Sequence, residues 1–309
     1  MSGIVRIGLP DLVSNSYFPA IAAVELGFMR EEGLEAELEL LFPVTDAAHA
    51  LREGRLDFLA GAAHAPLYAF PDWQGARLVA ALSSNTYWFL VVRADLGIDK
   101  GDLSALHNLN IGAAAGVGEA LRQLLERAGV DLDARNITIA PVPGTDSSSV
   151  SFGVSAAKAL ARGHVDAFWA NGMGADVAVR TGAGTIVLDA RRDGGDAASF
   201  TFPALATTQA LIDSEPEKVA AAVRGIVRAQ TALRCDPQLA TQVGDRVFPA
   251  MEATLIAAIV ERDLPFYDAA ISVSAIAGVS AFGRRAGLLT ADAVYEQVVA
   301  TQFAALWKA

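Results

Sequence analysis

The sequence predicts an α/β fold of two βαβαβ lobes followed by C-terminal helices, and three observations carry this prediction. The first 41 residues predict a short strand, a loop, a helix and a second strand. The spacing of apolar residues changes from a period of 3.6 to a period of 2, which marks the change from helix to strand. One helix–glycine–strand pattern occurs twice. From Glu215 onward strand signals stop and only helical periodicity remains. A chain of 309 residues has room for two such lobes.

The opening unit begins with a strand, Ile4–Gly8, followed by a loop, Pro10–Pro19. We expect Ser16 to cap a single helix that starts at the end of this loop and finishes at Gly33, in the left-handed cap position. Alternating glutamates then predict a strand over Glu35–Leu40 with one wet face. In open α/β sheets, ligands bind at the carboxyl ends of strands, so the first loop is a candidate ligand loop.

The rest of the chain continues this alternation, and the polar segment Asp95–Leu106 is expected to begin the second lobe. The segment 170–176 is expected to be a loop. The other expected strands are Leu56–Ala60, Leu78–Ser83, Tyr87–Arg93, Leu109–Ala114, Asn136–Val142, Val165–Trp169 and Gly184–Leu188. The other expected helices are Thr45–Glu53, two that end at Arg127 and Arg162, and Pro216–Arg234, Glu252–Arg262 and Asp292–Leu306.

The repeated pattern is A-L-x-x-G-x-[LV]-D, found in Ala50–Leu59 and again in Ala159–Phe168. Each copy contains a helix end, a glycine cap and an entering strand, and each lies at the same place in its own βαβαβ segment. The alternative is a common junction that occurs twice by chance. Two lobes with ligand loops at strand ends imply a cleft between them. We expect residues 1–90 with 200–309 to form one lobe and 91–199 the other.

Composition excludes several classes of function. The net charge of −11 disfavours nucleic acid and anionic membranes, which bind basic surfaces. No apolar run is long enough for membrane insertion. Cys235 is the only cysteine and no metal-binding spacing is present, so we expect neither metal nor cofactor. The N-terminus lacks a secretory signal, which predicts either a processed extracytoplasmic protein or, for a native full-length chain, a cytoplasmic one.

A set of blocks in a fixed order resembles the type II periplasmic solute-binding proteins. These blocks are AAVELGFMREEGLEAELEL, ALREGRLDFLAG, VVRADLGI…DLSAL…LNIGAAAG, ALARGHVDAFWAN and SEPEKVAAAVRGIVRAQ. The similar branch includes the sulfonate, nitrate and taurine binders and the thiamine-pyrimidine synthases. The resemblance implies a type II periplasmic-binding-protein fold, with two hinge crossings, near Tyr87–Arg93 and Ser199–Thr208, about which the lobes close on a solute.

Four loops supply candidate site residues. Ser14 and Asn15 in the first loop either contact a ligand or only make the turn. His64 in the second loop is flanked by alanines, so we expect it to pack against little. The third loop, Gly116–Gly118, precedes a helix whose free N–H groups favour anions, although Glu119 competes for them. In the fourth, Thr145–Ser149, the hydroxyls either surround an anion or form a polar connection. The residues expected to contact the solute are Asp11, Ser14, Asn15, Tyr17, His64, Asn85, Trp88, Gly116, Val117, Gly118, Ser147, Ser148, Trp169, Asn171 and Phe200.

These features together predict the solute receptor of an ATP-binding-cassette importer, with a membrane permease as partner. The solute is expected to be a small organic molecule, anionic or aromatic, such as a sulfonate, a carboxylate or a pyrimidine-like ring. The alternative is a cytoplasmic enzyme acting on an aromatic or heteroaromatic acid, with Ser14 and His64 central. By resemblance, Ser14 stands where desulfinases carry a nucleophilic cysteine, and His64 matches a histidine of the pyrimidine synthases. Their cysteine cluster has no counterpart here, so we expect no catalytic residue.

Overall fold

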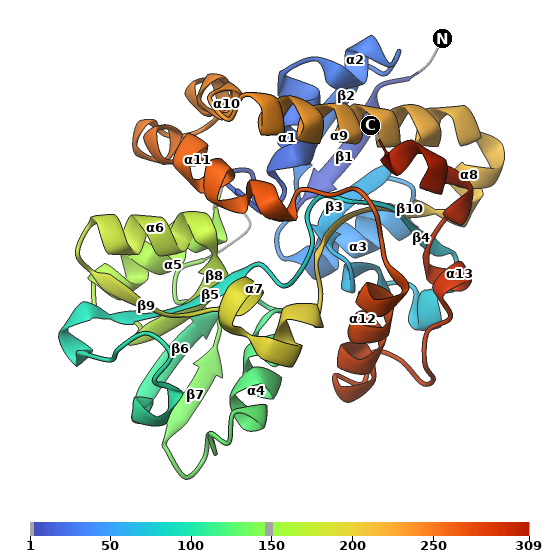
Figure 1. The fold of residues 1–309 in the computed structure, drawn as a ribbon. Helices are drawn as coiled ribbons and strands as arrows, with labels where there is room; N and C mark the ends of the chain where they lie inside the picture. The colour runs from blue at the N-terminus through green and yellow to red at the C-terminus, as the bar shows by residue number, and fades with distance from the viewer. Residues whose placement is uncertain (1–2, 146–150, 309) are drawn as a thin grey trace. The chain divides into compact units, whose positions relative to one another are not determined.

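The chain forms two compact units in the computed structural model, which describes residues 3–145 and 151–308 (Figure 1). The first unit consists of Met1–Asn85 together with Ser199–Ala309, and the second consists of Thr86–Ala198. The chain therefore passes into the second unit after Asn85 and returns after Ala198. Each unit is built around a five-stranded sheet of its own.

The sheet of the first unit has the strand order β2-β1-β3-β10-β4. β1 pairs in parallel with both β2 and β3, whereas β10 is antiparallel to its neighbours β3 and β4. Its central strands are buried on both faces, as strands covered by helices on each side should be. The strands are β1 Val5–Leu9, β2 Ala36–Leu40, β3 Phe58–Ala62, β4 Ala76–Ala81 and β10 Pro203–Thr208.

Helices cover both faces of this sheet because the strand order reverses at β1. The connection β1–α1–β2 moves one way along the sheet and β2–α3–β3 moves the other way, so right-handed crossovers place α1 and α3 on opposite faces (Figure 1). The long helix α9 packs beside α1 and α2. The helices are α1 Phe18–Glu25, α2 Phe28–Glu31, α3 Val44–Arg52, α8 Gln209–Ser214, α9 Pro216–Cys235, α10 Leu239–Val247, α11 Ala250–Asp263, α12 Val273–Arg285 and α13 Tyr295–Val298.

The second unit repeats this topology with the strand order β7-β6-β8-β5-β9. β6 is parallel to β7 and β8, and β5 is antiparallel to β8 and β9. Its strands are β5 Trp88–Arg93, β6 Leu109–Ala113, β7 Ile137–Ala140, β8 Ala167–Asn171 and β9 Gly184–Asp189. Its helices are α4 Gly118–Arg127, α5 Phe152–Ala161, α6 Gly172–Arg180 and α7 Ala190–Asp193.

The sequence repeat is a structural equivalence, not a chance match. Its aspartate directly precedes a strand in both units: Asp57 precedes β3, the neighbour of β1, and Asp166 precedes β8, the neighbour of β6. The Asp57 carboxylate accepts a hydrogen bond from the Arg6 backbone N–H at 2.8 Å, and Asp166 accepts one from the Asn110 N–H at 2.9 Å. In return, the backbone N–H of Asp57 donates to the Arg6 carbonyl, and that of Asp166 donates to the Asn110 carbonyl. The motif therefore joins two strands at their amino ends.

The repeat extends to a glycine in the neighbouring strand. A Cβ added to Gly8 of β1 would lie 2.2 Å from the Leu56 side chain, and one added to Gly112 of β6 would lie 2.4 Å from Val142 and 3.3 Å from Val165. Leu56 and Val165 occupy the same position of the repeat. Each glycine therefore leaves space for apolar side chains that pack directly against its strand.

Two expected elements differ at the ends of the chain. The single helix predicted up to Gly33 is wrong, because Gly27 adopts φ +84° and divides it into α1 and α2. The helix N-cap is Tyr17, and the hydroxyl of Ser16 makes no hydrogen bond to the described residues, so the predicted Ser16 cap is also wrong. The helix expected over Asp292–Leu306 is only α13 and a separate turn of 3-10 helix over Thr301–Trp307.

The loop expected over 170–176 is also wrong, because α6 begins at Gly172. The side chain of Asn171 caps this helix by accepting a hydrogen bond from the Gly174 N–H at 3.1 Å. Gly174 of α6 and Gly153 of α5 let the two helices approach closely, since a Cβ on Gly174 would lie 2.5 Å from the Gly153 carbonyl oxygen. Gly174 is therefore a helix-packing residue, although its sequence surroundings resemble a loop.

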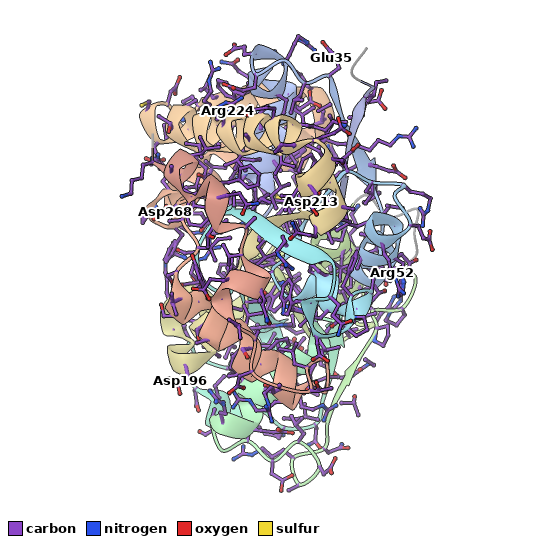
Figure 2. All side chains as sticks on the ribbon, turned by 90° about the vertical axis from the view of Figure 1, so that its right-hand side faces the viewer. Glu35, Arg52, Asp196, Asp213, Arg224 and Asp268 are labelled. Carbon is purple, nitrogen blue, oxygen red and sulfur yellow. The ribbon has the colours of Figure 1, made fainter. Side chains whose placement is uncertain are left out.

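Charged side chains tie α9 to the end of α2 in the first unit. Figure 2 labels Arg224 on α9, whose Nε lies 2.5 Å from a carboxylate oxygen of Glu32. Arg228 pairs with the other oxygen at 3.0 Å and also with Glu31. The hydrogen bond from Arg224, supported by Arg228, holds the pKa of Glu32 below its usual range against the opposing effect of burial.

Candidate functional site

One edge of the first unit's sheet collects most of the predicted residues of that unit. β1 and β3 are parallel neighbours, so the loops that follow them leave the sheet at the same edge. β10 runs antiparallel to β3, with Pro203 opposite Ala62, so the residues just before β10 lie at that edge too. The strand order reverses between β1 and β3, which is the position where open α/β sheets bind ligands.

The first loop is buried and held by its own polar side chains. Asp11 accepts a hydrogen bond from the Val13 N–H at 3.0 Å, and the Ser14 hydroxyl accepts one from the Ser16 N–H at 3.1 Å. Both residues are buried, as is Tyr17 at the start of α1. Asp11 and Ser14 therefore shape the turn, which was one of the two roles expected for Ser14.

His64, at the end of β3, has no exposed surface. Its Nδ1 lies 3.0 Å from the hydroxyl of Thr201, just before β10. The imidazole ring meets the Phe282 ring edge-to-face at 4.9 Å and the Tyr68 ring at 5.9 Å. The expectation that His64 packs against little is wrong, because the side chains of Tyr68, Thr201 and Phe282 contact the ring.

Phe200 lies beside this histidine cluster. Its ring stacks on Phe282 at 5.6 Å, and the Arg285 guanidinium lies 6.0 Å from its centre. Asn85 follows β4 at the same edge of the sheet and adopts a positive φ of 65°. Asparagine tolerates this left-handed conformation better than most residues, so Asn85 has a backbone role at the point where the chain leaves the first unit.

Asp263, the last residue of α11, is a part of this edge that sequence reasoning missed. Its carboxylate is 2% exposed and accepts a hydrogen bond from the Asn15 side-chain amide at 2.7 Å. The Nε of Arg262 lies 3.4 Å from its other oxygen. No sequence signal connects residues 248 positions apart, so only the packing of α11 reveals the contact.

The second unit has a corresponding edge at the carboxyl ends of β6 and β8. Trp88 begins the antiparallel strand β5 opposite Asn171, so both lie at this edge. Trp169 is completely buried two residues earlier, with its ring 5.9 Å from that of Trp88. Asn171 is engaged as the cap of α6. The two tryptophans thus form part of the sheet's core at the base of this edge.

The third loop borders a hollow of about 220 Å³ at the carboxyl ends of β6 and β7. Gly116 adopts φ +81°, Val117 is the N-cap of α4 and Gly118 is the first helical residue. The walls of the hollow include Glu119 and Arg122, whose side chains lie 3.8 Å apart. The Glu119 carboxylate therefore lies in the first turn of α4, where the sequence analysis expected it to compete with a bound anion.

The structure thus places the predicted residues in two groups, one for each unit. The predicted residues Ser147 and Ser148 lie outside the described residues. A basic residue that the sequence analysis did not select, Arg191, is buried just after β9, where its backbone N–H donates to the Asp189 carboxylate at 3.0 Å. The described residues contain no group of acidic, histidine or cysteine side chains arranged to hold a metal ion. None of the described helices is long and apolar enough to cross a membrane.

The family described as NMT1/THI5 like matches residues 14–240 of this chain. The match covers well over half of the sequence and includes the first loop from Ser14 onward, His64 and both copies of the repeat. The chain belongs to the NMT1/THI5-like family. The resemblance inferred from the sequence blocks is therefore confirmed. A comparison with curated protein sequences finds no match.

Solved structures share the fold over nearly the whole chain at low sequence identity. A protein from Bordetella bronchiseptica RB50 has a TM-score of 0.77 and 17% identity, and the alignment covers 98% of this chain and 96% of that chain. The alkanesulfonate-binding protein SsuA from Xanthomonas axonopodis pv. citri, bound to MOPS, has a TM-score of 0.71 and 17% identity, with 96% and 98% covered. The desulfurization enzyme DSZB has a TM-score of 0.68 and 18% identity, with 97% and 98% covered. The predicted type II periplasmic-binding-protein fold is confirmed.

Proposed function

We propose that this protein is the solute-binding receptor of an ATP-binding-cassette importer. In this role it binds one small organic solute through the polar loops at the carboxyl edges of its sheets and delivers it to a membrane permease. The location that suits this role is outside the cytoplasm. The solute classes consistent with the sequence are sulfonates, carboxylates and pyrimidine-like rings, and hinge closure of the two units on the solute is part of the proposal.

The observation that carries the proposal is the cluster of buried polar side chains at the β1–β3 edge. Asn15 and His64 come from loops far apart in sequence, and the sheet brings them to its topological switch point. Each has a partner on a further segment, Asp263 for Asn15 and Thr201 for His64. Side chains held from behind in this way are preorganised to bind a small molecule without reordering.

The comparisons support the same reading through family and fold. The chain belongs to the NMT1/THI5-like family, and the alkanesulfonate-binding protein SsuA shares this fold over 98% of its chain. The desulfurization enzyme DSZB has the fold as well, so fold alone does not separate receptor from enzyme.

One observation favours an enzyme as the second candidate. Ser14 and His64 are completely buried at the ends of adjacent parallel strands, where a nucleophile and a base would both have to lie. A serine attacks only when a base removes its proton, and the Ser14 hydroxyl accepts a hydrogen bond from the Ser16 N–H. The enzyme reading therefore requires His64 to reach Ser14 while its Nδ1 stays with Thr201.

Native mass spectrometry of the purified protein tests the proposal. We expect at most one small molecule per chain, and after denaturation the solute should be released with its mass unchanged, even after long incubation. Thermal-shift screening with sulfonates, aromatic carboxylates and pyrimidines should find a stabilising class, because a ligand that binds only the folded form raises its stability. Turnover that is abolished by Ser14→Ala or His64→Ala would refute the receptor and establish the enzyme.

A further inference from the structure

The two outer strands of the first unit's sheet, β4 and β2, differ in what covers them. At the β4 edge the C-terminal segment pairs with the strand, where the Ala300 N–H donates to the Leu78 carbonyl at 2.9 Å. The Trp307 indole N–H donates to the Val79 carbonyl of the same strand at 2.8 Å. At the other edge, β2 pairs with β1 and with no further strand of the described residues. β2 therefore presents an open edge, to which a strand of another chain can add.

The backbone of β2 shows which groups this edge offers. The Glu35 carbonyl and the Leu41 N–H both bond to β1, at 2.7 and 3.0 Å. Alternate residues of a strand turn their backbone groups to opposite sides, so the N–H and C=O groups of Ala36, Leu38 and Leu40 point away from β1. None of these groups makes a hydrogen bond within the part of the chain that the structure describes. The edge thus offers a row of alternating donors and acceptors.

The side chains of β2 alternate between apolar and acidic. The apolar side chains are half-buried on one face of the sheet, and the glutamates lie on the other face. Among the described residues, Glu37 and Glu39 have neither an ion pair nor a side-chain hydrogen bond, although Arg6 of β1 is the register neighbour of Glu37. Glu35, labelled in Figure 2, begins this acidic row, and the Arg30 Nε lies 3.4 Å from its carboxylate. The row carries more negative than positive charge.

The glutamates decide which kind of strand can add to this edge. When two β2 strands pair antiparallel about Leu38, Glu37 of each copy lies opposite Glu39 of the other, and like charges directly opposite each other destabilise a sheet. Basic side chains at those places form opposite-charge pairs instead. The equivalent outer strand of the second unit, β7, has no charged residue, and the Ile137 N–H of that strand already donates to the Leu132 carbonyl at 2.8 Å.

We propose that the β2 edge docks an extended segment of a partner protein in which basic and apolar side chains alternate. The backbone of that segment pairs with the outward groups of Ala36, Leu38 and Leu40, and its basic side chains pair with Glu37 and Glu39. Its apolar side chains cover the half-buried face of β2. This docking goes beyond the proposed function, because it uses the lateral edge of the sheet and not the carboxyl ends of the strands.

A seven-residue peptide of alternating lysine and valine, acetylated and amidated at its ends, is the probe. A peptide with glutamate in place of lysine reverses its charge. A third peptide keeps the lysines but carries a methyl group on every backbone nitrogen, so it cannot donate to the edge. The lysine peptide should bind the wild-type protein at least about tenfold more tightly than either control. In NMR spectra it should shift the amide signals of Ala36, Leu38 and Leu40 downfield, because their N–H groups gain acceptors.

Charge reversal at the edge tests the specificity. The double variant Glu37→Lys with Glu39→Lys should bind the lysine peptide at least about tenfold more weakly and should prefer the glutamate peptide. The matched control is Glu126→Lys with Glu296→Lys, which makes the same change in net charge at two exposed positions outside β2. This control should keep the preference for the lysine peptide.

The proposal is wrong if the lysine peptide does not bind, if its N-methylated form binds as tightly, or if the edge amides do not shift. Equal effects of the two double variants would also refute it, because binding would then follow the net charge of −11 and not β2. Shifts of the same amides on concentrating the protein alone would identify a second copy as the occupant and overturn the proposal. If the edge variant does not fold, the three peptides decide on the wild type. Each of these outcomes leaves the solute receptor to its own test.

Discussion

Replacing His64 by alanine should destabilise the folded protein even when no ligand is present. The ring is completely buried, and its removal leaves the Thr201 hydroxyl, itself 1% exposed, without the partner that lies 3.0 Å away. The loss of one hydrogen bond costs about 0.5–1.5 kcal/mol, and each lost edge-to-face ring contact, here with Phe282 and Tyr68, costs about 0.5–1.5 kcal/mol. Because these contributions overlap, we expect a loss of about 2–4 kcal/mol in the free energy of unfolding.

Urea unfolding of the ligand-free protein, followed by tryptophan fluorescence and by circular dichroism, measures this loss directly. His49→Ala is the matched control, because His49 is exposed on α3 and its removal should change stability by no more than about 0.5 kcal/mol. If His64→Ala unfolds at the same urea concentration as the wild type and the control, the enclosed ring contributes nothing and the packing argument is refuted.

Three further predictions concern the two sheets and their helices. Gly174→Ala should cost about 1–3 kcal/mol in thermal unfolding, since the new Cβ would meet backbone that cannot move aside; an unchanged midpoint contradicts the close approach of α5 and α6. Asp57→Asn and Asp166→Asn should destabilise the protein by similar amounts, each about 1–2 kcal/mol, whereas a cost at one site only would argue against their equivalence. The pKa of Glu32 is lowered in the folded state, so its contribution to stability is present above its unfolded pKa and is lost as the pH falls through the folded value. Arg224→Met should raise the pKa of Glu32 measured by NMR, and an unchanged pKa would show that Arg224 is not the cause.

Local rules predicted the parts of the fold that depend on local chemistry. The two copies of the helix–glycine–strand motif could be recognised in the sequence because a helix that ends in a left-handed residue usually requires glycine there. Gly54 and Gly163 both adopt this positive φ. α6 was missed because Gly172 and Gly174 resemble a loop in sequence. Close packing against α5 selects Gly174, and packing between helices leaves no mark on local propensity.

The candidate site could be predicted only as far as its loops. Loops at strand ends follow from the βαβ pattern, so Asn15 and His64 could be selected. Thr201 and Asp263, which hold them, are 137 and 248 positions away along the chain, and no periodicity connects such positions. The same lack of long-range information led to the expectation that His64 is loosely packed.

The antiparallel strand β10 has a consequence for the order in which the chain can fold during synthesis. It lies between β3 and β4, although it is made only after the whole second unit. Until it leaves the ribosome, β4 has no neighbour and the first sheet stays open. At about 5–20 residues per second, the roughly 120 residues from Asn85 to the end of β10 take about 6–25 s to make. The contiguous second unit can therefore close its own sheet first, and the part of the protein that is synthesised first is the last to be completed.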